Sequence, residues 1–574
     1  MIEFWINKIV LSDSSSFSFS KNDIIVFVGP NNSGKSKALQ NIYTQISDSS
    51  YQGQVITNIE TSSSGTDDEV TEHIKQQSVV GTNGGSVSYQ WMGGNSFQPI
   101  NIIKNKWNRK TGGLNDLYTF FSRLLSTDER LHLARRVEHI DYGEMPSTHP
   151  LHLICDNEEL ANKLNDSFKK AFNTDLFMSQ KPSKNVILRV GDKPILEAGE
   201  NLVSDSYTAK IRALPAIDEQ GDGMRAYAGI IIHSLASSYT ILLIDEPEAF
   251  LHPPQARHLG RTLAESIAQS RQLFISTHSG DVLRGLLDSN KDNIHVIRLS
   301  RGNGGNINQG HLLDKSQIKE IWNAPILRYS NVLDGIFHER VIICESDADC
   351  RFYSAVMDWI FESDGNSKRP DIMFIHSGGV GGIDKIMRSL QALSVPVSIV
   401  VDFDALNKSE IKTLSDNLNI SWNNAVVHLD KIRNIISNIP PCSPETTKVK
   451  FDIDNILTTE TGQFVSPRGV EKIREVVKSK SGWSSAKKIG RDIFHPTFTT
   501  QVKADEGSDA LSSLLALYNT SGLFVVEIGE LESFCRIDNL KSGEWLEKIF
   551  EDNSLRNRAF DSARSFVEKI LGIA

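Results

Sequence analysis

Length, composition and charge restrict what this chain can be. It has 574 residues, of which 39% are hydrophobic and 23% are charged, and its formal net charge is −10. Single hydrophobic cores stop growing near about 250–300 residues, so we expect two or three domains. The composition excludes a largely disordered chain, and the net charge alone gives no indication of nucleic-acid binding. Glu3 and Lys8 interrupt the first apolar run and no apolar stretch is long enough for a membrane span, which predicts a cytoplasmic protein.

The five cysteines form no metal-binding or disulfide pattern. No CxxC pair occurs and the total is odd, which argues against a zinc ribbon and against a disulfide framework. We expect small, buried, apolar side chains instead. The residues are Cys155, Cys344, Cys350, Cys442 and Cys535.

The first motif is the segment GPNNSGKS at residues 29–36. The apolar run before it predicts a strand at 23–28 and the pattern after it predicts a helix at 37–47, which is the context that a GxxxxGKS phosphate loop requires. Glycines let the backbone wrap the phosphates of ATP, whose charge meets N–H groups at the helix N-terminus. We expect Lys35 to reach the β- and γ-phosphates and Ser36 to bind Mg²⁺. The predicted cofactor-binding residues are Gly29, Asn31, Asn32, Ser33, Gly34, Lys35, Ser36 and Asp245.

The second motif of the first half is acidic and follows the apolar strand predicted at 239–244. Asp245 is expected to hold Mg²⁺ through its water shell, and Glu246 to polarise the attacking water. A further strand at 272–276 leads into a Thr-His-Ser segment, whose His278 is expected to sense the γ-phosphate. Together with the phosphate loop, these residues predict ATP hydrolysis.

Segments 245–255 (DEPEAFLHPPQ) and 276–279 (STHS) resemble the ABC-type ATPases of the SMC, Rad50 and RecF kind. The resemblance is greatest to the version in the OLD (overcoming lysogenization defect) family. It implies that a signature loop from one subunit completes the nucleotide site of another, hence a homodimer or higher homo-oligomer. Residues 220–225 (QGDGMR) are the candidate loop, although Gly221 stands where the family commonly has a serine.

Roughly 200 residues separate the two nucleotide-site motifs, which requires an insertion. Apolar spacing predicts a helix over 157–172 within it. The OLD resemblance implies that the region around 150–210 supports dimerisation, and the alternative is an ordinary helix of the ATPase lobe. Residues 52–94 are rich in Ser, Thr, Gly and Asn, and predict exposed loops and edge strands.

A second acidic pattern begins after Asp334. The strand predicted at 340–344 ends in Glu345 and Asp349, with a helix at 350–361, and the strand at 397–401 ends in Asp402 and Asp404. Parallel strands place such side chains at one edge of the sheet, where α/β folds bind ligands. Four converging carboxylates repel one another unless a hard divalent cation neutralises them, so the pattern predicts Mg²⁺ or Mn²⁺.

A strand-end glutamate followed by a DxD motif resembles the TOPRIM fold of type IA and type II topoisomerases, DnaG-type primases and OLD nucleases. Ser346 stands where those enzymes often have glycine. The OLD resemblance also implies a late acidic pair at a second metal position, for which Glu530 and Glu532 are the candidates after a strand at 523–526. The alternative is a charged helix N-terminus. A lysine near the scissile phosphate is implied as well, without an assigned position.

Three further segments are candidates for contact with nucleic acid. Basic segments at 104–110 and 478–491 each contain a tryptophan, which suits phosphate neutralisation and base stacking, whereas the alternative is a solvated face. Trp483 belongs to the second, inside an insertion predicted at about 438–515. The glycine-rich segment 376–382, after a strand at 372–375, is either a phosphate contact or a plain turn.

The predicted fold is α/β, with an ABC/SMC-like P-loop ATPase domain carrying a helical insertion over 1–335 and a TOPRIM domain with a parallel sheet over 336–574. The predicted catalytic residues are Glu246, His278, Glu345, Asp349, Asp402 and Asp404. The predicted metal-binding residues are Ser36, Asp245, Glu345, Asp349, Asp402, Asp404, Glu530 and Glu532.

The resemblance implies an ATP-hydrolysing, divalent-metal-dependent DNA endonuclease of bacterial antiphage defence, with RNA as the other possible substrate. It further implies a partner such as the helicase of Gabija or a retron reverse transcriptase with its nucleic acid. The alternative is a RecF- or SMC-like repair or scaffold ATPase whose acidic lobe does not cut. A topoisomerase is disfavoured because no tyrosine-bearing strand-passage domain is evident, and a primase because no zinc module is present.

Overall fold

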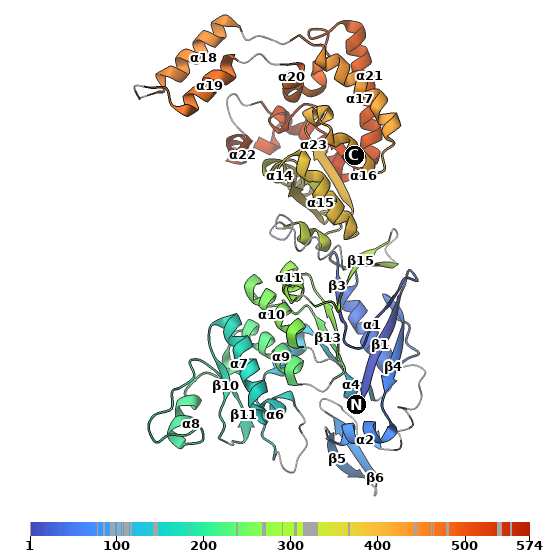
Figure 1. Ribbon diagram of the computed structural model, residues 1–574, viewed down its shortest axis with the longest axis vertical. Coiled ribbons are helices and arrows are strands. Elements are labelled where there is room, and N and C mark those ends of the chain that lie inside the picture. The colour runs from blue at the N-terminus through green and yellow to red at the C-terminus, as the bar shows by residue number, and fades with distance from the viewer. Residues whose placement is uncertain are drawn as a thin grey trace. The chain divides into compact units, whose positions relative to one another are not determined.

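The chain forms two compact units, Met1–Phe337 and His338–Ala574, which are described separately below (Figure 1). This computed structural model describes residues 2–76, 78–83, 86–91, 98–99, 101, 105, 107, 114, 117–141, 147, 149–181, 183–236, 239–266, 271–289, 291–302, 307–313, 331–364, 368–440, 445–460, 462, 464–477, 481–536, 542–551 and 554–573. Within these ranges, no helix has the length and apolar character to cross a membrane.

A six-stranded sheet in the order β16-β15-β3-β14-β13-β8 forms the centre of the first unit. All its strands are parallel except β16. Strands β3 and β14 are buried along their whole length, as the continuous apolar runs of parallel strands predict. The bounds are β3 (Ile24–Val28), β8 (Ser122–Leu125), β13 (Ile241–Asp245), β14 (Gln272–Ser276), β15 (Ile294–Arg301) and β16 (Asn308–Leu312).

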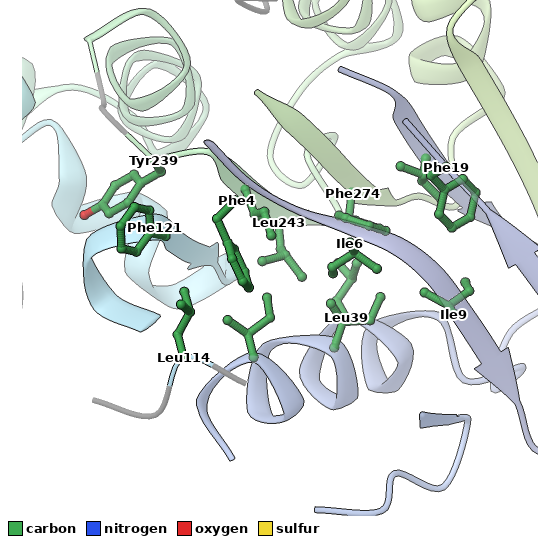
Figure 2. Close-up of a cluster of buried hydrophobic side chains, with 14 of the residues drawn as sticks. Phe4, Ile6, Ile9, Phe19, Leu39, Leu114, Phe121, Tyr239, Leu243 and Phe274 are labelled. Atoms are coloured by element: carbon green, nitrogen blue, oxygen red, sulfur yellow. The ribbon is translucent and has the colours of Figure 1, made fainter. Parts of the chain in front are cut away.

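A smaller antiparallel sheet shares its core with this one. Its strands are β2 (Ser16–Ser18), β1 (Glu3–Leu11) and β4 (Ile56–Ser64), in that order. Figure 2 shows Phe4 and Ile6 of β1 beside Leu39 of helix α1 (Lys35–Ser47) and Phe274 of β14. Because α1 is held in this core, the loop that precedes it is fixed at the end of β3.

Helices pack around the central sheet. Helix α5 packs against α9, and α10 against α11. The predicted helix at 157–172 is α7, capped by the Asn157 side chain at its start and by a left-handed Asn173 at its end. The bounds are α4 (Tyr118–Phe121), α5 (Thr127–Leu133), α6 (Pro150–Cys155), α7 (Glu158–Phe172), α8 (Asp205–Arg212), η2 (Ile217–Glu219), α9 (Asp222–Ala236), α10 (Pro253–Ser266), α11 (Gly280–Asp288) and η3 (Asn331–Phe337).

The insertion of the first unit also contains short strands, which helical spacing did not predict. They form two antiparallel pairs, β10 with β12 and β11 with β9. Each strand has only two or three residues, too few for an alternating pattern to be recognised. The bounds are β9 (Val137–Glu138), β10 (Leu176–Met178), β11 (Asn185–Val186) and β12 (Leu188–Val190).

The prediction of loops and edge strands for residues 52–94 is wrong in one respect, because helix α2 (Asp67–Gln76) lies there. Thr66 and Glu69 form a reciprocal cap: the Glu69 N–H donates to the Thr66 hydroxyl at 3.2 Å, and the Thr66 N–H donates to the Glu69 carboxylate at 2.9 Å. This T-x-x-E signal was present in the sequence. The strands nearby are β5 (Ser78–Asn83), β6 (Ser86–Trp91) and β7 (Gln98–Pro99).

The second unit is built on a four-stranded, fully parallel sheet in the order β18-β17-β19-β20. Aromatic side chains of α14, η6 and α22 pack together, with Phe352, Phe534 and Trp545 in contact. The bounds are β17 (Arg340–Cys344), α14 (Asp347–Asp364), β18 (Ile372–His376), α15 (Val380–Ala392), β19 (Val397–Val401), β20 (Leu523–Val525), η6 (Leu531–Phe534), α22 (Ser542–Glu551), η7 (Ser554–Arg556), η8 (Arg558–Phe560) and α23 (Asp561–Leu571).

A helical insertion separates β19 from β20. Helices α17 and α21 pack together, and α18 and α19 form a hairpin (Figure 1). Helix α20 packs against η4, which directly follows β19. The insertion therefore returns to the carboxyl edge of the sheet before β20 begins. The bounds are η4 (Phe403–Asn407), α16 (Glu410–Asn417), α17 (Trp422–Ser437), α18 (Thr446–Thr458), α19 (Pro467–Val477), α20 (Gly482–Ile489), η5 (Gly490–Phe494) and α21 (Gln501–Thr520).

Candidate functional sites

The phosphate loop joins β3 to α1 with the backbone that its glycines allow. Gly29 and Gly34 have φ of 136° and 92°, and a Cβ on Gly29 would lie 2.1 Å from the Leu299 carbonyl oxygen. Lys35 is 3% exposed, and its Nζ donates to the carbonyls of Gly29 and Pro30, each at 2.8 Å. Asn308 of β16 donates to the Ser33 carbonyl at 2.6 Å.

The outer residues of this loop are open to a ligand. The side chains of Asn31 and Asn32 are exposed, and that of Ser36 is half-buried at the start of α1. The glycine-shaped loop, the buried lysine and the helix N-terminus together fit the phosphates of ATP.

Strands β13 and β14 neighbour each other and bring the acidic motif beside the histidine. Asp245 accepts a hydrogen bond from the Ser276 hydroxyl across the strand pair. The Nε2 atom of His278 lies 3.0 Å from Glu246 Oε1. Burial, and then the charge of Lys35, lower the pKa of His278, which Glu246 partly opposes. The predicted nucleotide-site residues thus meet at the ends of three adjacent parallel strands.

Glu248, to which the sequence assigned no role, supports this arrangement. It is half-buried, and its carboxylate accepts from the His278 N–H at 2.7 Å and from the Thr277 hydroxyl at 2.9 Å. Burial raises the pKa of Glu248. Its position in the DEPE motif was visible, but its partners belong to a strand some 30 residues further along the chain.

The candidate signature loop leads into α9, which begins at Asp222. A Cβ on Gly221 would meet nothing within 4 Å, so this residue borders open space. A Cβ on Gly223 would lie 2.6 Å from the Phe250 carbonyl oxygen, so the loop is packed against the segment that follows Glu246.

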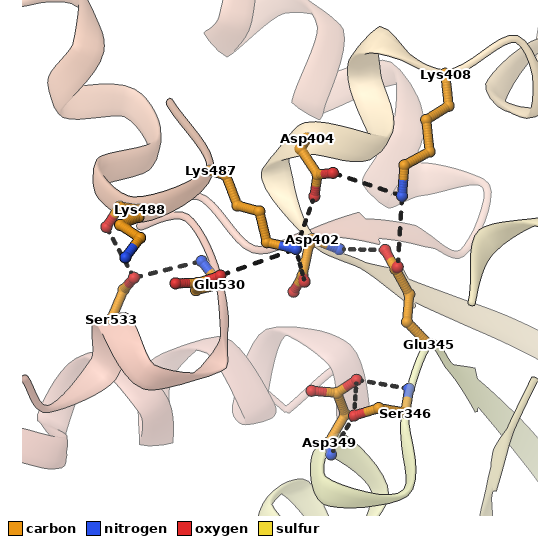
Figure 3. A network of polar contacts seen from close by, with 10 residues as sticks. All are labelled: Glu345, Ser346, Asp349, Asp402, Asp404, Lys408, Lys487, Lys488, Glu530 and Ser533. Atoms are coloured by element: carbon orange, nitrogen blue, oxygen red, sulfur yellow. Dashed lines mark hydrogen bonds and ion pairs between the residues drawn. The ribbon is translucent and has the colours of Figure 1, made fainter. Parts of the chain in front are cut away.

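In the second unit, the ends of β17 and β19 bring Glu345, Asp402 and Asp404 together (Figure 3). Glu345 Oε1 accepts from the Asp402 N–H at 2.9 Å. Among the described residues, the buried Oδ1 of Asp404 has no hydrogen-bond partner. Burial raises the pKa of Glu345, and burial followed by the Glu345 and Asp349 charges raises that of Asp402 well above its usual range.

Asp349 lies at the start of α14, where it also caps the helix. Its carboxylate accepts from the Ser346 N–H at 2.8 Å and from the Ser346 hydroxyl at 2.9 Å (Figure 3). Ser346, a departure from the glycine of related motifs, therefore orients Asp349 instead of disrupting the site. Burial raises the pKa of Asp349, and the Glu532 charge adds to the increase.

Of the late acidic pair, Glu530 reaches the same cluster. Its Oε2 lies 3.9 Å from the Nζ of Lys487, whose ammonium also approaches Asp402 and Asp404. Burial and the neighbouring Glu532 raise the pKa of Glu530. Glu532 itself is half-buried on η6, and its charge contributes to the raised pKa of Asp349.

Two lysines complete the cluster, and the sequence did not identify either. Lys487 Nζ lies 3.8 Å from Asp404 Oδ1 and 3.9 Å from Asp402 Oδ2. Lys408 Nζ lies 3.5 Å from Asp404 Oδ2 and 3.8 Å from Glu345 Oε2. Lys487 belongs to the basic segment 478–491, whose composition suggested a DNA-binding arm. Only folding shows that α20 carries this lysine to the carboxylates.

The donor set fits a hard divalent cation such as Mg²⁺ or Mn²⁺. All the candidate ligands are carboxylate oxygens, and among the described residues the buried Oδ1 of Asp404 accepts no hydrogen bond, although Lys487 Nζ lies 3.8 Å away. Within the described parts of the chain, however, no three acidic, histidine or cysteine side chains already converge on one point as metal ligands. Instead, the ammonium of Lys487 lies between three carboxylates (Figure 3).

Other predicted segments take different positions. The basic segment 104–110 lies mostly outside the described residues. In the glycine-rich segment, the Gly379 N–H donates to the backbone carbonyl of Glu345 at 2.8 Å, so this turn borders the acidic cluster. Cys344 and Cys350 are buried, Cys155 and Cys535 are half-buried, and Cys442 lies outside the described residues.

Parts of both units match known protein families. Residues 336–404, from η3 to Asp404, match the family described as overcoming lysogenization defect protein-like, TOPRIM domain. Residues 156–284, which include the DEPE motif and His278, match an AAA domain family described as putative AbiEii toxin, Type IV TA system. The chain is thus an α/β protein with a P-loop ATPase domain followed by a TOPRIM domain.

A curated relative is the Old nuclease of Escherichia phage P2, 24% identical over 276 residues. The match covers 43% of this chain and 45% of the relative, so it spans less than half of either protein.

Solved structures with partial likeness include two SMC head domains. The SMC head domain from Thermotoga maritima is 11% identical with a TM-score of 0.28, and covers 54% of this chain and 99% of its own. The SmcHead bound to the C-winged helix domain of ScpA is 13% identical with a TM-score of 0.32, and the corresponding shares are 55% and 99%. At these scores neither likeness decides the fold or the function.

Proposed function

We propose that the first unit binds and hydrolyses ATP and that the second is a divalent-metal-dependent nuclease that cuts DNA. The observation that carries the nuclease half is the meeting of Glu345, Asp402, Asp404 and Glu530 with two lysines at one sheet edge. Acidic residues that bind divalent cations and lysines that bind phosphate oxygens are the parts that phosphodiester hydrolysis needs. The local match to a TOPRIM family and the nuclease named among the relatives support this proposal.

In the first unit, Lys35 and the backbone amides of the phosphate loop bind the phosphates of ATP. Ser36 and Asp245 hold Mg²⁺, which supplies positive charge against the phosphates when bound. Glu246 orients and polarises the attacking water, and its partner His278 stands where the γ-phosphate can be sensed. Gly221 and its neighbours on a second copy complete the site in a homodimer or larger homo-oligomer, which the insertion at about 150–210 helps to form.

In the second unit, Glu345, Asp349, Asp402 and Asp404 hold a divalent cation, and Glu530 with Glu532 extends the set toward a second position. When bound, the cations supply Lewis acidity at the phosphodiester. The positive charges of Lys487 and Lys408 offset the repulsion among the carboxylates. The same two lysines bind phosphate oxygens of the substrate. The glycine-rich turn beside Glu345 gives the DNA backbone room to approach.

The OLD resemblance extends the proposal to bacterial antiphage defence in the cytoplasm. The TOPRIM match over residues 336–404 supports this extension. A helicase, as in Gabija, or a retron reverse transcriptase with its nucleic acid is the kind of partner proposed. Neither system is favoured over the other by the residues of the two sites.

A plasmid-cutting assay tests the nuclease. Purified protein with supercoiled plasmid and Mg²⁺ or Mn²⁺ should produce nicked or linear DNA, and Glu345→Gln should lower the rate by roughly 100-fold or more because a cation ligand is lost. Glu362→Gln, an exposed glutamate on α14, is the matched control and should cut at the wild-type rate. Undiminished cutting by Glu345→Gln would remove this site from the mechanism.

ATP binding is tested separately. Lys35→Ala should abolish measurable ATP binding by calorimetry, because the phosphates lose their buried cation. Lys37→Ala, two residues along α1 and outside the loop, should bind ATP as the wild type does. Normal binding by Lys35→Ala would show that the nucleotide site lies elsewhere.

The second candidate function is a repair or scaffold ATPase whose second unit does not cut. It is favoured by the absence, in the described residues, of three acidic side chains already converging as ligands, and by the lysine ammonium between them. Under this alternative the plasmid stays supercoiled with either metal, while ATP is still bound and hydrolysed.

A further inference from the structure

A buried arginine contacts the backbone of a residue of the candidate nucleotide site. Arg130 of α5 is 0% exposed. Its Nη1 donates to the backbone carbonyl of Glu246 at 2.7 Å, and its Nη2 donates to the Thr127 hydroxyl at 3.0 Å. Burial lowers the pKa of Arg130, and the Glu248, Asp245 and Glu246 charges oppose that effect. A buried guanidinium is costly unless it is paired, and here both terminal nitrogens donate hydrogen bonds, whereas Nε has no hydrogen-bond partner among the described residues.

Glu246 has a strained backbone conformation. Its φ is 48°, in the left-handed region that is strained for a non-glycine residue. Its N–H donates to the Ser276 carbonyl at 2.9 Å, and its own carbonyl accepts from Arg130. The same carbonyl also accepts from the Ala249 N–H at 3.0 Å, so Arg130 provides the one side-chain hydrogen bond among the three that the described residues make with the Glu246 backbone.

Helix α5 is itself fixed by α9, the helix that follows the candidate signature loop. A Cβ on Gly229 of α9 would lie 2.8 Å from the Arg130 carbonyl oxygen, so the two backbones are in close contact. Arg225 of α9 also donates to the Leu131 carbonyl at 3.3 Å. Arg130 is therefore held from behind while its guanidinium holds Glu246.

We propose that Arg130 is a positioning residue for ATP hydrolysis, which keeps Glu246 in its left-handed backbone conformation and so places the carboxylate that polarises water. This inference rests on the proposed ATPase function of the first unit. The hydrogen bonds of Arg130 go to the Glu246 carbonyl and the Thr127 hydroxyl, neither of which belongs to the phosphate loop. Arg130 therefore governs the rate of hydrolysis and leaves the affinity for ATP unchanged.

A double-mutant cycle on the full-length protein tests this role. Arg130→Met should lower kcat for ATP about 100-fold while KM changes less than about twofold. The double variant Arg130→Met/Glu246→Gln should be no slower than Glu246→Gln alone, because both changes remove the same contribution. Arg130→Lys keeps a charged donor and should recover part of the rate.

Arg271→Met is the matched control. Arg271 is also buried and donates to a backbone carbonyl, that of Ser234 at 2.5 Å, but at the opposite end of α9. This control should lower the melting temperature without changing kcat. Thr127→Val, which removes only the hydroxyl that orients the guanidinium, is the milder second variant should Arg130→Met not fold, and should lower kcat about tenfold.

The outcomes separate the inference from the function on which it rests. Additive losses in the double variant, or a wild-type kcat in Arg130→Met or in Thr127→Val, would overturn the positioning role. A wild-type rate in Glu246→Gln would instead contradict the proposed ATPase chemistry itself.

Discussion

At the residue scale, each candidate site contains a lysine whose ammonium is held by oxygen atoms of the protein. Lys35 faces its own loop carbonyls, whereas Lys487 faces three carboxylates at 3.8–3.9 Å. Burial lowers the pKa of Lys487, and the charges of Asp404, Asp402 and Glu530 outweigh it, so the pKa is raised. Lys487 is therefore charged at neutral pH and available to a phosphate.

Replacing Lys487 tests its part in cutting. Lys487→Met keeps much of the side-chain volume but removes the charge, and we expect plasmid cleavage to fall by roughly 100-fold. Lys488→Met, the exposed neighbour on α20 whose backbone carbonyl makes the local contacts, should cut normally. Equal cleavage rates for the two variants would mean that the charge of Lys487 has no part in DNA cleavage.

At the scale of elements, the position of α20 depends on one glycine. Gly490 ends the helix with φ 54° and ψ −129°, a conformation open mainly to glycine. A Cβ there would lie 2.0 Å from the Glu527 carbonyl oxygen. The close approach of α20 to the segment after β20 is thus what delivers Lys487 to Asp402 and Asp404.

Gly490→Ala should separate these two segments. We expect the melting temperature of the second unit to fall. At a temperature where the protein is still folded, DNA cleavage should fall at least tenfold, and ATP hydrolysis by the first unit should be retained. Gly543→Ala on α22, where a Cβ meets nothing within 4 Å, is the control and should leave both activities unchanged. Normal cleavage by Gly490→Ala would show that α20 need not stay in place.

At the scale of the whole molecule, each unit has a hydrophobic core of its own. The first unit also buries a group of histidines: the His149 ring lies 6.2 Å from His152 and 6.1 Å from His233, between centroids. Burial lowers the pKa of His149 to about 4, with His152 and Arg123 adding to the effect. These side chains are thus neutral in the folded unit at pH values where an unfolded chain would bind protons.

Acid should therefore destabilise the first unit. An unfolded histidine has a pKa of about 6.5. The stability that comes from keeping His149 neutral is therefore fully present above that pH and is lost as the pH falls toward 4. Thermal unfolding followed between pH 7.5 and 5 should show a falling midpoint. His149→Asn keeps a capping acceptor for the Leu151 N–H but cannot titrate, and should flatten this dependence. An unchanged slope in this variant would assign the effect to other groups.

The sequence by itself determined the features that depend on local order. Strands at 272–276, 340–344 and 397–401 have the predicted bounds, because short apolar runs between polar residues suit a buried parallel sheet. The same apolar runs also located the phosphate loop, the DEPE segment and the acidic residues, because each of these directly follows a predicted strand. The roles assigned to these residues stay predictions until the variants are measured.

Only the tertiary structure decided which distant side chains meet. Lys487 stands 142 positions after Glu345 (487 − 345) and reaches the same cluster because α20 returns to the carboxyl edge of the sheet. Arg130 and Glu246 are 116 positions apart and share a hydrogen bond. Periodicity reports which face of an element is buried, whereas the pairing of lysines and arginines with particular carboxylates and carbonyls depends on how whole elements pack.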